Sequence, residues 1–316
     1  MSRFWPLIRL VPRQTHFDFV SLAPYAAVLS ALAIVGASLS FVVQGMNFGV
    51  DFVGGTVMEV STPGPAPLGP IRADLARLEA HDAQVQIFGN PNSARVQFRS
   101  VQGKDANAGA VFVASQLTSQ FPGLKVSGQS TVGAKVSGEL VWKGVFALGT
   151  ALLLMLLYIW FRFQLQFGLG AILALFHDIA LTIGLLCVTQ IEVSMTSIAA
   201  LLTVIGYSMN EKVISFDRLR ENLRKFKRTP LREVINLSEN ERLSRTIITG
   251  TTALLALSGA LFMGGPALFP LVFTMAFGIF IGTYSSIYVA LPVILLWGVR
   301  RDDEEARPIG PQPARP

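Results

Sequence analysis

The sequence predicts a polytopic α-helical membrane protein with six transmembrane helices and one small α+β domain outside the membrane after the first helix. Hydrophobic residues make up 51% of the 316 residues, charged residues only 15%, and the mean hydropathy is +0.51. Soluble domains usually carry about 25% charged residues. Six apolar stretches approach or exceed the roughly 20 residues that a helix needs to cross a bilayer. One long polar stretch separates the first two of them.

The expected spans are residues 22–44, 141–161, 165–189, 193–217, 246–264 and 269–299. The first is too long for the apolar core of a signal peptide, and about 20 residues that include Asp18 precede it, so it is interpreted as an uncleaved anchor. The last contains Pro292, which predicts a kink or a tilt.

Lys and Arg predict the orientation. They are frequent in the tail at residues 1–21, in the loop at 218–245 and in the tail at 300–316, whereas the short loops at 190–192 and 264–269 hold none. The positive-inside rule therefore predicts cytoplasmic termini, and a long domain can be translocated in spite of its own charges. Because the basic residues cluster beside apolar spans, nucleic acid is not an expected partner. The single cysteine, Cys187, lies inside a span, which argues against a disulfide framework or a metal cluster.

Residues 45–140 are expected to form the outer domain. Short segments in which apolar and polar residues alternate, bounded by turn residues, predict strands at 56–61, 84–88, 94–99 and 125–132. Segments with apolar residues at helical spacing predict helices at 71–80 and 106–121. Pro70 is expected to open the first helix. The order β-α-β-β-α-β is typical of the ferredoxin-like fold, which hosts many functions. The prolines at 63–70 and the glycines at 128–138 are hypothetical hinges.

The basic loop at 218–245 has apolar residues spaced among its charges. One interpretation is a pair of amphipathic helices that lie on the inner leaflet or dock a cytoplasmic partner. The other is a solvated segment that only fixes topology. The sequence leaves both open.

Ionisable groups inside the spans are the most informative feature. Asp178, preceded by His177, lies near the middle of the third span, on a face that small residues share. The fourth span carries a polar stripe of Ser208, Glu211 or Lys212, and Ser215, while its other side, with Met209, Val213 and Phe216, is a candidate for lipid contact. Intramembrane charges are costly and suggest an ion path or a proton relay.

Simpler interpretations of these residues exist. Glu211 and Lys212 lie near the end of their span and could snorkel to water. His177 could be a hydrogen-bonded packing residue. Counting at 1.5 Å per residue puts Lys212 about 10 Å nearer the cytoplasm than Asp178, so contact between them is open, and water, Tyr207 or Ser208 could bridge them.

Several stretches resemble the SecF family, the smaller membrane subunits of SecDF protein-export factors in the RND superfamily. The resemblance runs from the first span to the last. It rests on residues 47–56 (NFGVDFVGGT), 174–178 (ALFHD), 199–210 (AALLTVIGYSMN), 216–222 (FDRLREN), 244–246 (SRT) and 282–286 (GTYSS). The family usually has Asp-Thr where this chain has Glu211-Lys212.

The resemblance implies half of an RND-type bundle in a bacterial cytoplasmic (inner) membrane. It implies Asp178 as proton acceptor and Lys212 as its counter-charge. Supporting polar groups would be Glu211, Tyr207, Ser208 and Asn210. The residues expected to serve the family motifs structurally are Gly49, Asp51, Gly54, Gly55, His177, Asp217 and Arg218. Helix packing, internal or against a partner subunit, is expected of Gly278, Gly282 and Ser286.

The implied function is not enzymatic and needs no cofactor beyond a coupling ion, H⁺ or alternatively Na⁺. With a SecD-like subunit, the chain would use the proton motive force to promote translocation of an unfolded secretory polypeptide through the SecYEG channel. YajC is a further candidate partner, and the lipid bilayer is the surrounding medium. Two alternatives stay open: half of a proton-driven RND-type exporter of small molecules or lipids, and a scaffold of the translocon that transports nothing.

Overall fold

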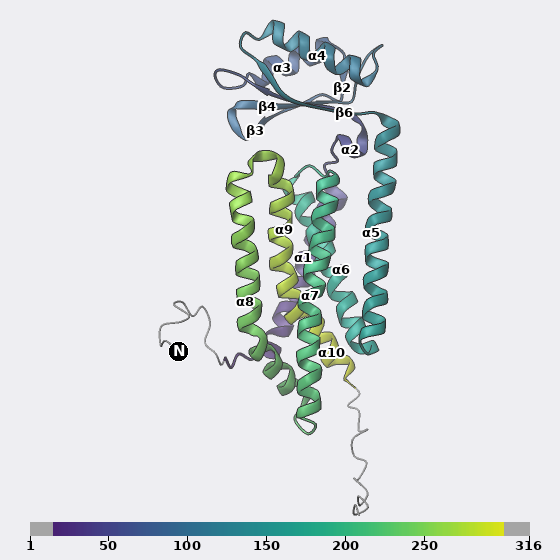
Figure 1. The fold of residues 1–316 in the computed structure, drawn as a ribbon, viewed down its shortest axis with the longest axis vertical. Helices are drawn as coiled ribbons and strands as arrows, with labels where there is room; N and C mark the ends of the chain where they lie inside the picture. The colour runs from purple at the N-terminus through teal and green to yellow at the C-terminus, as the bar shows by residue number, and fades with distance from the viewer. Residues whose placement is uncertain (1–14, 300–316) are drawn as a thin grey trace, which may run out of the picture.

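The computed structural model describes residues 15–299. A bundle of long helices carries a small sheet domain at one end (Figure 1). Five helical segments in the described part of the chain are long and apolar enough to cross a membrane: α1 (Phe19–Gln44), α5 (Ala134–Arg162), α6 (Leu165–Thr189), α8 (Leu231–Met263) and the continuous segment Gly265–Trp297. The chain is thus a multi-pass membrane protein.

The last of these segments is continuous but irregular. It consists of α9 (Gly265–Ser285), one π-helical turn η1 (Ser286–Ala290) and α10 (Leu291–Trp297). Pro292 stands near the start of α10 and cannot donate the hydrogen bond that a regular helix requires. The irregularity expected from this proline is therefore present, as a π turn directly before it.

Helix α7 (Met195–Lys225) covers most of the fourth expected span, 193–217, but is not among the five apolar segments. Glu211 and Lys212 make it less apolar than its neighbours, and both side chains are buried inside the bundle. In Figure 1, α7 runs between α6, α8 and α9. Protein therefore surrounds the charged part of this helix.

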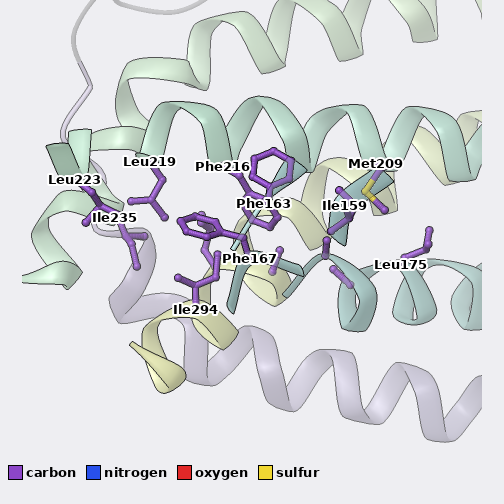
Figure 2. Close-up of a cluster of buried hydrophobic side chains, with 14 of the residues drawn as sticks. Ile159, Phe163, Phe167, Leu175, Met209, Phe216, Leu219, Leu223, Ile235 and Ile294 are labelled. Carbon is purple, nitrogen blue, oxygen red and sulfur yellow. The ribbon is translucent and has the colours of Figure 1, made fainter. Parts of the chain in front are cut away.

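The region at 218–245 is helical, as one of its two interpretations expected, but its helices do not lie on a leaflet. Helix α7 continues to Lys225 and α8 already begins at Leu231, so only a short turn separates two long helices. Leu219, Leu223 and Ile235 pack in the core of the bundle (Figure 2), whereas helices lying on a leaflet would expose them. The apolar spacing of this region thus serves contact between α7 and α8.

The assignment of Met209 and Phe216 to a lipid-facing side is also wrong. Met209 is 2% exposed and Phe216 is fully buried. Phe216 makes edge contacts with Phe163 and Phe167, at ring-centroid distances of 5.6 and 5.3 Å (Figure 2). Since α7 is central, its apolar side faces other helices rather than lipid.

The domain expected at 45–140 contains a four-stranded sheet in the order β3-β4-β1-β6, with antiparallel neighbours throughout. Two helices cover the face that points away from the bundle (Figure 1). Its apolar core lies between these helices and the sheet. The elements are β1 (Gly55–Ser61), α3 (Leu68–Arg77), β3 (Gln84–Phe88), β4 (Asn90–Phe98), α4 (Ala106–Gln120) and β6 (Lys125–Val132).

Most expected elements of this domain are present within a few residues. Helix α3 begins at Leu68, so Pro70 lies inside its first turn and does not start it. A small ladder of β2 (Ala80–His81) with β5 (Ser100–Val101) was not expected, and neither was the one-turn helix α2 (Val50–Val53). Strand β6 passes into α5 through Gly133 alone.

Candidate functional site

Asp178 and Lys212 form a buried ion pair between α6 and α7. The distance from Lys212 Nζ to Asp178 Oδ2 is 2.8 Å, and both residues are fully buried. Contact between them, which the sequence left open, is therefore direct. Ser208 donates to the same carboxylate oxygen and accepts from Lys212 Nζ, so it bridges the pair from within α7. The spacing of four residues puts Ser208 and Lys212 on one face of the helix.

Ser285, at the end of α9, completes the surroundings of this pair. Its hydroxyl donates to Asp178 Oδ2 at 2.8 Å and accepts from Lys212 Nζ at 3.1 Å. Three helices thus supply the polar groups around one carboxylate. A buried charge is tolerated when it is paired and its remaining hydrogen-bonding positions are satisfied, and both conditions hold here.

His177 lies on the other side of Asp178. Its Nδ1 is 3.0 Å from Asp178 Oδ1, and its Nε2 is 3.1 Å from the hydroxyl of Ser30 on α1. The hydroxyl of Ser30 also contacts that of Tyr284, whose ring stacks on the imidazole. The histidine is therefore hydrogen-bonded and packed, and it fixes the orientation of the carboxylate.

A second buried cluster joins α7 to α8. Arg242 forms a bidentate pair with Glu239, with Nη2 to Oε2 at 2.6 Å and Nε to Oε1 at 2.8 Å, and its Nη1 reaches Glu211 Oε2 at 3.3 Å. The two glutamates are 1% exposed and Arg242 is 4% exposed. Glu211 is therefore bound to Arg242 of this second cluster, and its expected part in a proton relay stays a prediction.

Hydroxyl groups complete the second cluster. Ser215 donates to Glu239 Oε1 at 2.6 Å, and Thr246 donates to Glu211 Oε2 at 3.2 Å. Arg242 Nη2 donates to Ser286 at 2.9 Å. Because Ser286 follows Ser285, and Lys212 follows Glu211, the two clusters are adjacent at two places in the chain.

Two of the expected supporting residues lie outside the hydrogen bonds of the two clusters, and their supporting role stays a prediction. Asn210 is exposed, whereas the residues of both clusters are buried. Tyr207 is half-buried, and its hydroxyl oxygen has no hydrogen-bond partner among the described residues. Asp217 and Arg218 lie further along α7, where Asp217 pairs with Arg162 at 2.9 Å and Arg218 pairs with Glu241 at 2.7 Å.

The sequence interpretation gave no role in the site to Glu239, Arg242 or Thr246, although Thr246 is part of the motif at 244–246. They lie three and four residues apart, which puts them on one face of a helix. This spacing was the available signal, but the charge density of the region favoured a solvated loop. Ser30 carried no signal, since an isolated serine in an apolar helix is common, and Ser285 was noted only as part of the motif at 282–286, without a role of its own.

The segment before the outer domain ties that domain to α7. Asp51 Oδ2 accepts a hydrogen bond of 2.9 Å from the backbone N–H of Met195, the first residue of α7. Gly49 packs so closely on Glu192 that a side chain would collide with it. Gly54 and Gly55 have φ of 73° and 127°, and a Cβ on Gly55 would lie 2.6 Å from the carbonyl oxygen of Phe98, so glycine is required at both.

The small residues of α9 serve packing within the chain. A Cβ on Gly278 would collide with Val204, and one on Gly282 would lie 3.0 Å from the Cβ of Ser208. Close approach of α9 to α7 therefore depends on them, as in small-residue helix interfaces of membranes. Of the two open interpretations of these glycines, internal packing is the one the contacts support. Ser286, which was also expected to serve helix packing, accepts a hydrogen bond from Arg242.

The fold and these clusters define a class: a multi-pass membrane protein with a small α+β domain at one end of the bundle and a buried network of ion pairs. Among residues 15–299, no group of three or more His, Cys, Asp or Glu side chains is placed to hold a metal ion. The pattern described as "Protein export membrane protein SecD/SecF, C-terminal" matches residues 113–300, and "SecD/SecF GG Motif" matches residues 39–62. The chain belongs to the SecF family of protein translocase subunits.

Individual relatives agree over most of the chain. Protein translocase subunit SecF of Rhodobacter capsulatus is 42% identical, with 95% of each chain covered. SecF of Magnetococcus marinus is 41% identical, with 90% of this chain and 93% of that protein covered. These relatives are named as subunits of a translocase, a membrane transport component and not an enzyme.

Solved structures give the same fold. The crystal structure of SecDF from Thermus thermophilus, described as a translocon-associated membrane protein, matches with a TM-score of 0.83 and 31% identity over 92% of this chain. A SecDF structure in a super-membrane-facing form matches with a TM-score of 0.64. This chain spans only 40% of the first SecDF chain, so it corresponds to less than half of that protein.

Proposed function

We propose that this subunit, together with a SecD-like partner, uses the proton motive force to promote translocation of an unfolded secretory polypeptide through the SecYEG channel and its release on the outer side. The observation that carries the proposal is the buried Asp178–Lys212 pair at 2.8 Å. Such a pair inside a membrane bundle is costly to maintain and is typical of ion and proton paths. The role in the Sec pathway is supported by the family.

The proposed mechanism is a change of packing driven by a change of charge. A proton on Asp178 removes its attraction to Lys212, which holds α6 to α7. Loss of that attraction would favour a second packing of these helices. One proton crossing 100 mV releases about 2.3 kcal/mol, which is enough to bias two packings of similar free energy. Sodium is the alternative coupling ion, and ion replacement in the assay distinguishes the two.

The connection from the bundle to the outer domain would run through α7. The helix carries Lys212 in its middle, and its first residue is held by Asp51 of the segment that enters the sheet domain. A shift of α7 would therefore act on this segment. Arg95 of the sheet pairs with Glu192, just before α7, at 2.8 Å and provides a second link. The outer domain would hold or steer the emerging polypeptide.

The same proposal includes the finer architecture. We count α7 as a sixth span, because protein buries its charged groups. The β-α-β-β-α-β order with sheet order β3-β4-β1-β6 supports a ferredoxin-like outer domain. The basic turn between α7 and α8 favours cytoplasmic termini in a bacterial inner membrane. Six spans with one outer domain form half of a complete unit, which is why a SecD-like subunit is required and YajC is a further candidate.

The experiment is pulse-chase export of a secretory precursor in cells that lack the native gene. Cells are complemented with wild type, Asp178→Asn, or Asp82→Asn as a matched control on the exposed surface of the outer domain. We expect Asp178→Asn to insert normally, to co-purify with its partner and to lose export, while the control exports normally. Normal export by Asp178→Asn would reject the relay and favour a scaffold that transports nothing.

A further inference from the structure

A group of basic side chains lies where α5 ends and α7 continues beyond it, at the end of the bundle away from the sheet domain (Figure 1). A pocket of about 460 Å³ is present there. Its lining consists of Arg162, the last residue of α5, and of five residues of α7: Asp217, Arg220, Glu221, Arg224 and Lys225. Four cations and two carboxylates line this pocket, which leaves it with an excess of positive charge.

Both carboxylates of the pocket are already engaged by cations. Asp217 pairs with Arg162 at 2.9 Å. Glu221 pairs with Lys225 through Oε1 and with Arg218 through Oε2, both at 2.6 Å. The two acids therefore neutralise Arg162 and Lys225 and leave the excess charge on the other two cations of the pocket.

Arg220 and Arg224 carry that excess. Among the residues that the structure describes, neither guanidinium group has a hydrogen-bond or ion-pair partner. The two residues are four positions apart on α7, so they share one face of the helix, and their Cβ atoms are about 5–6 Å apart. Like charges at this spacing repel each other. An anion bound between the two guanidinium groups would remove this repulsion.

Exposed aromatic residues mark the membrane boundary beside the pocket. Trp160 and Phe161 directly precede Arg162 and are 76% and 87% exposed. Aromatic side chains at the ends of transmembrane helices are typical of the interface between lipid and water. Arg162 itself lies over the ring of Phe163, with its Cζ 5.1 Å from the ring centroid. The pocket therefore begins where the hydrocarbon region ends.

The pocket extends through the layer of lipid headgroups. Its ion pair with Arg162 puts Asp217 at the same depth as the end of α5. At 1.5 Å per residue, the Cα atoms of Arg220 and Arg224 lie about 5 and 10 Å further outward. The headgroup layer on each side of the hydrocarbon core is about 5–8 Å thick. Because helical side chains lean toward the N-terminus of their helix, both arginines reach back into this layer.

We propose that this pocket binds the phosphate group of an anionic phospholipid, with Arg220 and Arg224 as the phosphate-binding residues and Arg162 as a third cation on the membrane side. A guanidinium group binds phosphate in a bidentate manner. Basic pockets between transmembrane helices bind anionic headgroups in other membrane proteins. The acyl chains lie along the exposed apolar end of α5. The binding is independent of the proposed coupling to protons.

A specific site differs from diffuse attraction in its dependence on position. Any basic helix end attracts anionic lipid, and in the diffuse case each nearby arginine contributes about equally. The pocket instead requires the arginines that line it. Arg228 is the matched control, because it is exposed in the turn after α7 and does not line the pocket.

The test is native mass spectrometry of the full chain with its membrane partner, released from bilayers of equal parts phosphatidylglycerol and phosphatidylcholine. Only the first of these lipids has a net negative charge. We expect wild type to retain phosphatidylglycerol in preference to phosphatidylcholine. Arg220→Gln and Arg224→Gln should each lower this preference about fivefold, and the double variant about 25-fold. Arg228→Gln should keep the preference of wild type. Since Arg224 is exposed, Arg224→Gln decides the test if Arg220→Gln fails to insert.

Three results would overturn the proposal. Equal retention of the two lipids by wild type would mean that the arginines face water or an acidic protein. An equal loss of preference in Arg228→Gln and Arg224→Gln would mean that the attraction is diffuse. Displacement of the bound lipid by added inorganic phosphate would assign the pocket to free phosphate, since a lipid is also held by its acyl chains.

Discussion

Replacing Lys212 by Met should destabilise the bundle because it leaves a charged carboxylate without its partner. Lys212 Nζ lies 2.8 Å from Asp178 Oδ2 and 3.1 Å from Ser285 Oγ, and the lysine is fully buried. Met has a similar length but no charge. Asp178 keeps its hydroxyl donors in the variant but loses Lys212. Of the described residues, only His177 then lies within ion-pair distance of the carboxylate.

The magnitude follows from the burial of both groups. Removing one partner of a buried ion pair typically costs about 3–5 kcal/mol, because the remaining charge is uncompensated. Replacing both partners by neutral groups is often far less harmful. The double variant Asp178→Asn with Lys212→Met should therefore recover most of the stability that Lys212→Met loses, although neither should export.

The assay is the free energy of unfolding of the purified protein in bilayer mimics, measured for wild type, both single variants and the double variant. The cycle isolates the coupling between the two residues. Lys143→Met, a change of an exposed lysine on α5, is the matched control. A loss below about 1 kcal/mol in Lys212→Met, the range of an exposed ion pair, would refute the reasoning. A double variant no more stable than Lys212→Met would refute it equally.

The remaining predictions concern packing, capping and pH. Gly278→Ala should cost about 1–3 kcal/mol of stability because the added methyl group collides with α7, whereas Gly259→Ala, which meets nothing within 4 Å, should be neutral or slightly stabilising in the same unfolding assay. Asp51→Ala should lower stability by about 0.5–2 kcal/mol, and exchange of the first amides of α7 with deuterium should accelerate; unchanged exchange would contradict the capping role. Asp18 accepts hydrogen bonds from the side chain of Asn236 on α8 and from the backbone N–H of Ser21, and Arg232 lies beside it. These donors hold the pKa of Asp18 below its usual range. Its stabilising contribution should exist above its unfolded-state pKa and disappear as the pH falls through its folded-state pKa, so Asp18→Asn should be less stable than wild type near neutral pH only.

Much of the fold could be predicted because hydropathy and turn residues act locally. The third span was predicted at 165–189, the bounds of α6, and strands β3 and β6 were also predicted within their observed bounds. The short ladder of β2 with β5 was missed because two-residue strands carry no period. At 218–245 the sequence left helices and a solvated segment both open, because a charged helix surface and a charged loop have the same composition.

The site was predicted in part for a similar reason. Asp178 and Lys212 stand out because each is a charge in an apolar context. Glu239 and Arg242 have many charged neighbours in sequence, so only the three-dimensional packing of α7 on α8 reveals that they are buried. The direction in which a central helix faces cannot be read from its own period, which explains the wrong side assigned to Met209 and Phe216.

The central claim is that protons pass through the Asp178–Lys212 pair. The most direct measurement is proton flux into vesicles that contain the full chain with its SecD-like partner, under an imposed membrane potential and with sodium replaced by an impermeant cation. The proposed mechanism predicts flux in wild type and in Asp82→Asn, and flux reduced to that of empty vesicles in Asp178→Asn. Equal flux in wild type and Asp178→Asn, or flux that requires sodium, would contradict it.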